Sequence, residues 1–186
     1  MARGPGQRAG LTRAAVLAAA HDLLAGQGLD ALTMRALARR LDVAPNALYS
    51  HVPGKTELVD ALLDDRLALV EAPAVDAPDP AAALAELMTS TYEVLLGRPD
   101  LVPLYLARQG SRGPNAVSLG VVTDALLARL GLAAEAVPSA RRALIVHAIG
   151  AAAFASPDGP VPTDLARADF ARSLRWLLAG LSQPQR

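Results

Sequence analysis

Residues 33–55 read TMRALARRLDVAPNALYSHVPGK, and their pattern predicts two short helices joined by a tight turn. Apolar residues recur from Met34 to Leu41 at the spacing of one helix face. Thr33 stands just before this run, where its hydroxyl can accept a hydrogen bond from a free backbone amide. The second helix begins near Pro45, because the first turn of a helix tolerates a residue without an N–H. Two amphipathic helices joined so closely cross steeply, so one can enter a DNA major groove while the other braces it.

The second helix of this pair carries apolar or aromatic residues at helical spacing, which predicts its buried face. That predicted face consists of Pro45, Leu48, Tyr49 and Val52. Only Asp42 and Val43 lie clearly between the two helices. The turn is therefore expected to be short.

The helix pair also carries an extended motif. Its residues are Leu48-Tyr49-x-His51-Val52 and Lys55, preceded by Thr33-Met34-Arg35 and Leu37-Ala38-x-x-Leu41. At these residues the chain resembles the tetracycline-repressor (TetR) family of bacterial one-component regulators, and such long, spaced matches are more specific than a bare helix-turn-helix pattern. The chain departs from the family at Asp42, where Gly is usual, and at Ala47, where Ser or Thr is frequent. Asp nevertheless tolerates a left-handed backbone better than most residues.

Composition extends the helical prediction to the whole chain. The 186 residues are 52% hydrophobic but only 3% aromatic, which indicates helices packed through small side chains such as Ala and Leu. No continuous alternation of apolar and polar residues indicates a sheet. We therefore predict an all-α fold. Beyond the motif, helices are expected near residues 56–70, 80–96, 100–109, 115–130, 139–155 and 163–181.

The N-terminal segment superficially imitates a secretory signal peptide, because arginines precede an apolar run at 14–20. His21 and Asp22 interrupt that run, and a helix capped by Thr12 explains the same residues better. Its buried stripe is predicted at Val16, Ala20, Leu23 and Leu24, and its end at Gly26 and Gly28. A second apolar run, at 143–155, is too short to span a bilayer.

The predicted domain boundary follows the helix expected at 56–70. Residues 72–80 read APAVDAPDP, and prolines at this density cannot continue a helix. We predict a DNA-binding domain at 1–55, then a connecting helix with an effector-binding and dimerisation domain at 56–186. Residues 1–55 have a net charge of +4, which suits a surface that meets a polyanion. The basic residues are Arg3, Arg8, Arg13, Arg35, Arg39, Arg40 and Lys55.

The family resemblance implies DNA contacts for particular residues. Arg35 matches a position from which some members reach guanine, and its forked donors suit guanine O6 and N7. Asn46 could read adenine or a phosphate, whereas Tyr49 and Lys55 match positions that hold phosphates. His51 could contact a phosphate or pack between helices with a carbonyl as partner. The predicted set is Thr33, Arg35, Asn46, Ala47, Tyr49, His51 and Lys55.

In the second domain, polar and aromatic residues interrupt apolar segments. They are Thr91, Tyr92, Tyr105, Gln109, Asn115, His147 and Phe154. By resemblance, this domain encloses a pocket for a small organic effector, and such pockets are mostly apolar with a few orienting polar groups. For each residue a core or surface position is the alternative. Gly113-Pro114-Asn115 is also explained simply as the start of a helix.

The last two predicted helices carry more apolar surface than one small domain needs to bury. By resemblance, TetR-like proteins dimerise through these helices as a four-helix bundle, with a purely intramolecular core as the alternative. The predicted interface residues are Leu144, Ala148, Ala151, Leu174, Leu177, Leu178 and Leu181. Trp176 lies off the edge of that stripe.

Two function classes remain open on sequence grounds. The first is a cytoplasmic homodimeric repressor that a small organic effector releases from a palindromic operator, with motifs about 34–36 Å apart. The second is a helical small-molecule-binding protein with little specific DNA binding. An enzyme is disfavoured, because no nucleophile–base pair, carboxylate pair or metal-ligand spacing can be assembled. We expect no cofactor, metal or membrane partner, and the absence of cysteine fits a reducing cytosol.

Overall fold

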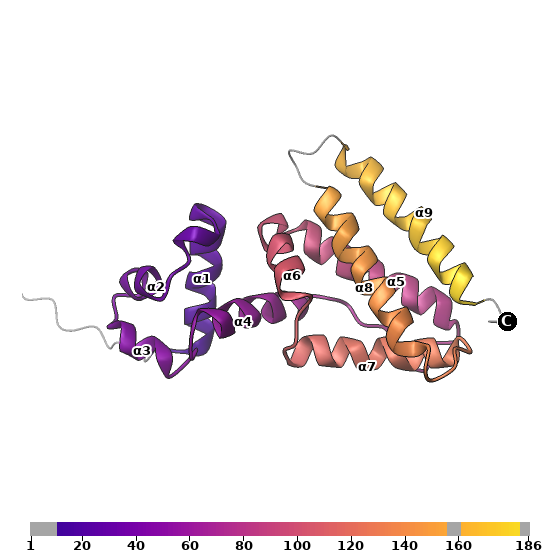
Figure 1. Cartoon of the computed structure of the whole chain (residues 1–186), viewed down its shortest axis with the longest axis horizontal. Helices are drawn as coiled ribbons and strands as arrows, with labels where there is room; N and C mark the ends of the chain where they lie inside the picture. The colour runs from indigo at the N-terminus through magenta and orange to yellow at the C-terminus, as the bar shows by residue number, and fades with distance from the viewer. Residues whose placement is uncertain (1–10, 156–160, 183–186) are drawn as a thin grey trace, which may run out of the picture. The chain divides into compact units, whose positions relative to one another are not determined.

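The computed structural model describes residues 11–155 and 161–182, and these residues form helices joined by turns, without strands (Figure 1). The predicted all-α fold is confirmed. The chain divides into two compact units, Met1–Leu62 and Leu63–Arg186, and the boundary falls inside helix α4. Arg3, Arg8 and most of the predicted break at 156–162 lie outside the described residues. The α-helices are α1 Arg13–Gln27, α2 Met34–Arg40, α3 Pro45–Tyr49, α4 Lys55–Leu67, α5 Pro80–Leu96, α6 Val102–Arg108, α7 Pro114–Arg129, α8 Val137–Phe154 and α9 Thr163–Leu181.

The first unit is organised by α1, whose predicted cap and buried face are both confirmed. Thr12 Oγ1 accepts a hydrogen bond from the Ala15 amide at 3.1 Å, which satisfies a donor that the helix cannot. The helix ends at Gly28, whose φ of 76° is the left-handed region that glycine enters without strain. Gly26, also predicted as an end, lies inside the helix. The buried face includes Val16, Ala20, Leu23 and Leu24.

The turn between α2 and α3 matches the sequence prediction in its cap and in the residue at its left-handed position, but not in its length. Thr33 Oγ1 accepts from the Ala36 amide at 3.1 Å, so the predicted cap of α2 is confirmed. Asp42 has a φ of 52°, which explains how an Asp replaces the usual Gly in a left-handed turn position. The turn is longer than expected, because residues 41–44 separate the two helices. The backbone N–H of Val43 donates to the Ala38 carbonyl at 3.0 Å and so closes α2.

Two predictions need correction, one about the buried face of α3 and one about the end of α4. Leu48 of α3 and Val52 after it are buried, but Pro45 and Tyr49 are exposed, because the short helix turns its opposite side to solvent. The helix expected at 56–70 ends at Leu67, and Leu69 is exposed. The amides of residues 68–70 donate to carbonyls three residues earlier, at 3.1–3.2 Å. This tighter winding turns Leu69 outward and Val70 inward.

The second unit is a helical bundle in which α8 contacts α5, α6, α7 and α9 (Figure 1). Its interior is built mainly from leucines of α5 and α7, including Leu84, Leu87 and Leu126, with Ala148 of α8. Asp79 caps α5 by accepting from the Ala81 amide at 2.9 Å. The helices expected near 80–96, 115–130, 139–155 and 163–181 are all present, whereas the segment near 100–109 begins with a 3-10 turn at Pro99–Leu101. Every helix within the described ranges is too short or too polar to cross a membrane.

Candidate functional site

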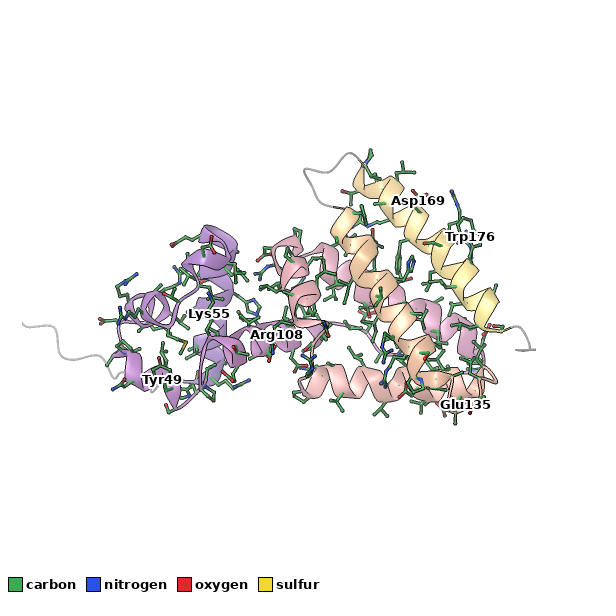
Figure 2. All side chains as sticks on the ribbon, in the orientation of Figure 1. Tyr49, Lys55, Arg108, Glu135, Asp169 and Trp176 are labelled. Atoms are coloured by element: carbon green, nitrogen blue, oxygen red, sulfur yellow. The ribbon has the colours of Figure 1, made fainter. Side chains whose placement is uncertain are left out.

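The helix pair of the first unit presents the predicted DNA-contact residues at its surface. Thr33, Arg35, Asn46, Ala47, Tyr49 and Lys55 are all exposed, at the start of α2, along α3 and at the start of α4. Figure 2 labels Tyr49 on α3 and Lys55 on α4. Exposure leaves the Tyr49 hydroxyl and the Lys55 ammonium available to an incoming phosphate. Thr33 already uses its hydroxyl oxygen to cap α2.

Some basic residues of this unit form ion pairs or hydrogen bonds within the protein, and others form no ion pair. Arg40 is paired with Asp22 of α1 at 2.9 Å, and Arg13 Nη1 donates to the backbone carbonyl of His51 at 3.1 Å. Arg13 therefore fixes the segment after α3 against the start of α1. Within the described residues, Arg35, Arg39 and Lys55 form no ion pair. Their charges are free to meet an external anion.

His51 occupies an intermediate position that neither predicted alternative describes fully. Its side chain is partly buried, and its backbone carbonyl, not its ring, accepts the hydrogen bond from Arg13. Its amide donates to the Leu48 carbonyl at 2.9 Å, which closes the end of α3. The sequence signal for Arg13 was only its charge, because a contact between residues 13 and 51 depends on the folded unit.

The second unit contains a cavity of about 160 Å³ between α5, α6, α7 and α8. Three residues of the predicted pocket set, Thr91, Tyr105 and Gln109, line it. The Thr91 hydroxyl donates to the Leu87 carbonyl at 2.8 Å, and the Tyr105 hydroxyl donates to the Leu63 carbonyl at 2.5 Å. Burial raises the pKa of Tyr105 well above its ordinary value, so its hydroxyl stays protonated at neutral pH.

The other four predicted pocket residues lie elsewhere. Tyr92 is buried and stacks on Phe170, with ring centroids 4.0 Å apart, so it belongs to the contact between α5 and α9. His147 stacks on the same Phe170 at 5.1 Å. Its Nε2 lies 3.0 Å from Ser173 Oγ. Burial lowers the pKa of His147 and raises that of Tyr92. Phe154 is 81% exposed on α8, and Asn115 binds Asp64 instead of facing the cavity.

A buried carboxylate joins the second half of α4 to the start of α7. Asp64 Oδ1 accepts from the Ala116 amide at 2.9 Å, and Oδ2 accepts from the Asn115 amide and side chain at 3.2 and 3.0 Å. The Asn115 side chain also donates to the Asp64 carbonyl at 3.1 Å. Asp64 thus caps α7 from another helix, where the positive end of the helix dipole favours an anion. We call Asp64, Gly113 and Asn115 the α4–α7 latch.

Gly113 is the member of the latch that makes the close approach possible. A Cβ atom at Gly113 would lie 2.2 Å from Asp64 Cγ, a distance at which no side chain fits. The prediction that Gly113-Pro114-Asn115 starts a helix is confirmed, since α7 begins at Pro114. The sequence did not reveal Asp64 as the cap, because 51 residues separate it from Asn115.

The predicted interface residues divide between the core and the surface of the second unit. Leu144, Ala148, Leu174 and Leu178 are buried within the single chain, whereas Ala151, Leu177 and Leu181 are partly exposed. The large apolar side chains that α8 and α9 leave open are different ones. Phe154 of α8 is 81% exposed, and Trp176, labelled on α9 in Figure 2, is 68% exposed. These two residues line one groove, and we call them the outward face.

Comparison with known proteins places the chain in a family. The family model described as bacterial regulatory proteins, tetR family, matches residues 16–62. A solved TetR variant from Acinetobacter baumannii, bound to minocycline, is 30% identical, with 91% of this chain and 96% of that one covered and a TM-score of 0.78. The chain belongs to the TetR family. The predicted resemblance is therefore confirmed.

Two further TetR-family matches extend the comparison. BioQ bound to its double-stranded DNA operator is 26% identical, with 92% of this chain and 98% of that one covered and a TM-score of 0.72. A curated transcriptional regulator from Saccharopolyspora erythraea is 32% identical over 75% of this chain and 59% of its own length. This chain thus spans about three-fifths of that curated regulator. The matched relatives are regulators, and among the described residues no three His, Asp or Glu side chains gather as metal ligands would.

Proposed function

We propose that the protein is a DNA-binding transcriptional repressor of the cytoplasm, released from its operator by a small organic effector. The observation that carries this proposal is the helix pair, whose family motif coincides with exposed residues able to contact DNA. The structure of BioQ with its operator and the minocycline complex of the TetR variant give both partner classes a precedent in the family. A catalytic role has no such support.

DNA recognition is assigned to the exposed residues by their chemistry. Arg35 reads a guanine, because its two parallel donors match O6 and N7. Asn46 reads adenine or a phosphate, and Ala47 supplies only apolar contact. Tyr49 and Lys55 hold phosphates and so set the position of α3 without reading sequence. Arg13 supports this surface indirectly, by holding the His51 carbonyl at 3.1 Å.

The effector cavity is assigned to the space lined by Thr91, Tyr105 and Gln109. Its walls hold the second half of α4 at two points, through the Tyr105 bond to Leu63 and through the α4–α7 latch. Leu67 of α4 lines the cavity directly. A ligand that prefers a different position of these walls therefore displaces α4, whose first half belongs to the DNA-binding unit. It weakens operator binding only by the difference in its affinity for the two positions.

A homodimer is proposed through α8 and α9. The outward face supports this assignment, because Phe154 and Trp176 line one groove and expose large apolar surfaces, which mark interaction sites when they gather. A groove of about 280 Å³ runs between Phe154 and Trp176 and could accept a side chain of the second copy. Two copies related by a twofold axis would present two copies of α3 to a palindrome.

Selection of bound fragments from the genomic DNA of the source organism tests the regulator. Enrichment of a palindrome, with affinity that falls steeply as salt rises, is the expected result. A protein that enriches no sequence but still binds small molecules would instead be the helical carrier predicted as the alternative. Titration of candidate effectors against the selected operator then measures release directly.

A further inference from the structure

The effector cavity opens beside a second hollow of different chemistry. This hollow, about 510 Å³, shares Tyr105, Gln109 and Ile149 with the cavity and adds Arg141 and Arg142 of α8. We call it the Arg142 groove. Shared lining residues place the cavity and the groove next to each other, so one elongated molecule can occupy both.

The cavity itself suits only an uncharged group. None of its lining residues is charged. Its Thr91, Tyr105 and Thr123 hydroxyls already donate to backbone carbonyls at 2.5–2.8 Å, so they offer lone pairs to a ligand. An anion placed there would lose its hydration and meet mainly acceptors, which is costly. The cavity therefore favours an apolar body.

The groove, by contrast, carries one uncompensated positive charge. Arg141 Nη1 is paired with Asp124 Oδ2 at 2.5 Å, so its charge is neutralised within the protein. Arg142 forms no ion pair within the described part of the chain, and no acidic residue lines the groove or the cavity. Gln109 lies in the wall of both and offers a side-chain amide donor. An anionic group at the end of a ligand would meet these donors.

A further polar group lies on the cavity side. The Ser111 hydroxyl is buried and has no hydrogen-bond partner among the described residues, although Ser111 lines the cavity next to Gly110. A buried hydroxyl without a partner costs stability, and a ligand atom can supply the missing bond. The Ser111 hydroxyl thus adds a donor near Gln109, and so near the mouth of the groove.

We infer that the effector is an amphipathic organic carboxylate, with its apolar body in the cavity and its carboxylate at Arg142. This assignment rests on the proposed effector-binding function and names the ligand class of that site. A carboxylate is favoured over a phosphate ester because its single negative charge balances the one uncompensated guanidinium of the groove, that of Arg142. A phosphate dianion would need more than the single uncompensated charge that the groove provides.

Matched naphthalene probes test the charge requirement. 2-Naphthoate and 2-naphthamide share a body and differ in the carboxylate, and 2-naphthyl phosphate replaces it with a dianion. Calorimetric titration of the full chain should give the order naphthoate, then phosphate, then amide. Arg142→Gln should weaken naphthoate about 3- to 10-fold, as expected for a partly exposed charged pair, and leave naphthamide unchanged. Arg175→Gln, an exposed arginine of α9 outside both hollows, should change neither.

Cavity-filling variants test where the apolar body lies. A Cβ atom at Gly120 would approach only the Arg141 guanidinium, at 3.4 Å, so Gly120→Leu can fold and should prevent binding of both probes. Leu119→Trp fills the same cavity from another position and serves if the first variant misfolds. Equal affinity for naphthoate and naphthamide, or phosphate binding that exceeds both, would overturn the carboxylate assignment. Unchanged naphthoate affinity in Arg142→Gln would do the same.

The operator assay separates this inference from the proposed function. If the protein enriches a palindrome but the Arg142 variant treats all probes alike, the ligand class is wrong and the regulator stands. If no sequence is enriched but naphthoate still depends on Arg142, the ligand class stands and the regulator fails.

Discussion

The first unit carries its candidate functional side chains on its surface, whereas the second unit carries them around an internal cavity. In the first unit, the residues assigned to DNA, such as Arg35, Tyr49 and Lys55, are exposed on short helices. In the second, Thr91 and Tyr105 line a cavity and are bound to backbone carbonyls of the fold. A surface site depends on local helix faces, whereas a cavity depends on which distant helices meet. Substitutions should therefore change DNA binding in the first unit, and stability, assembly or effector binding in the second.

The outward face is the exception within the second unit, and the largest effect is expected there. Phe154→Lys places a charge on the proposed dimer interface, where burial of an unpaired ammonium costs several kcal/mol. We expect the dimer dissociation constant to rise by at least about 100-fold, which corresponds to about 2.7 kcal/mol. Analytical ultracentrifugation over a concentration series measures it.

The control is Val121→Lys on α7, because Val121 is another large apolar side chain that is exposed, to 62%. It should leave assembly unchanged. Equal effects of the two variants would mean that exposure alone, and not the α8–α9 face, governs association. A dimer that survives Phe154→Lys would place the interface elsewhere.

The α4–α7 latch should show the next largest effect, on stability. Asp64→Ala removes a buried carboxylate that accepts from Ala116 and Asn115 and leaves their donors without a partner. We expect the free energy of unfolding to fall by about 2–4 kcal/mol. Asp79 is an exposed carboxylate that caps the start of α5 in the same way. Asp79→Ala should lower the free energy of unfolding by about 1 kcal/mol. Urea unfolding followed by circular dichroism compares them, and equal losses would show that the latch is an ordinary cap.

Base reading by Arg35 is the largest effect expected in the first unit. Arg35→Ala should weaken binding to the preferred operator by about 1–3 kcal/mol, and much less on an operator altered at the contacted base pair. Fluorescence anisotropy on matched and altered operators makes the comparison. A loss that is the same on both operators would reassign Arg35 to a phosphate.

Lys55 should show a smaller effect that does not depend on sequence. Lys55→Ala removes a cation that displaces a counterion, so affinity should fall on every operator and the salt slope should flatten by about one unit per bound subunit. Tyr49→Phe should weaken all sites with little change in slope, because its hydroxyl is neutral. Relaxed base preference in Lys55→Ala would reverse the roles of Lys55 and Arg35.

The same contrast between units explains what the sequence could predict. Helix boundaries and caps depend on neighbouring residues, so the Thr12 and Thr33 caps, the left-handed Asp42 and the helix at Pro80–Leu96 all followed from local pattern. The exposure of the motif residues was predicted only in part. Tyr49 was wrongly assigned to the buried face, because α3 is only five residues long. The roles of the motif residues on DNA stay predictions.

Contacts between distant residues could not be predicted in this way. Tyr105 binds Leu63 and Asn115 binds Asp64 across gaps of 42 and 51 residues, and no periodicity links them. Tyr92 and His147 interrupt apolar segments as pocket residues do, yet they stack on Phe170. Composition cannot separate a polar residue that faces a cavity from one that completes a core. Both kinds satisfy the same rule that buried polar groups find partners.

His147 gives the smallest expected effect and tests that distinction. Because burial lowers the pKa of His147, the unfolded chain takes up its proton first as pH falls through about 6.5. The stability contributed by neutral His147 is therefore complete above that pH and is lost as pH falls toward the lower folded pKa. His147→Gln should flatten the fall in unfolding free energy between about pH 7 and pH 5. His51→Gln in the first unit is the control and should keep the fall. If His147→Gln keeps the wild-type pH dependence, the imidazole of His147 in the wild-type chain takes up protons as readily when folded as when unfolded. Its stacking on Phe170 would then not exclude water.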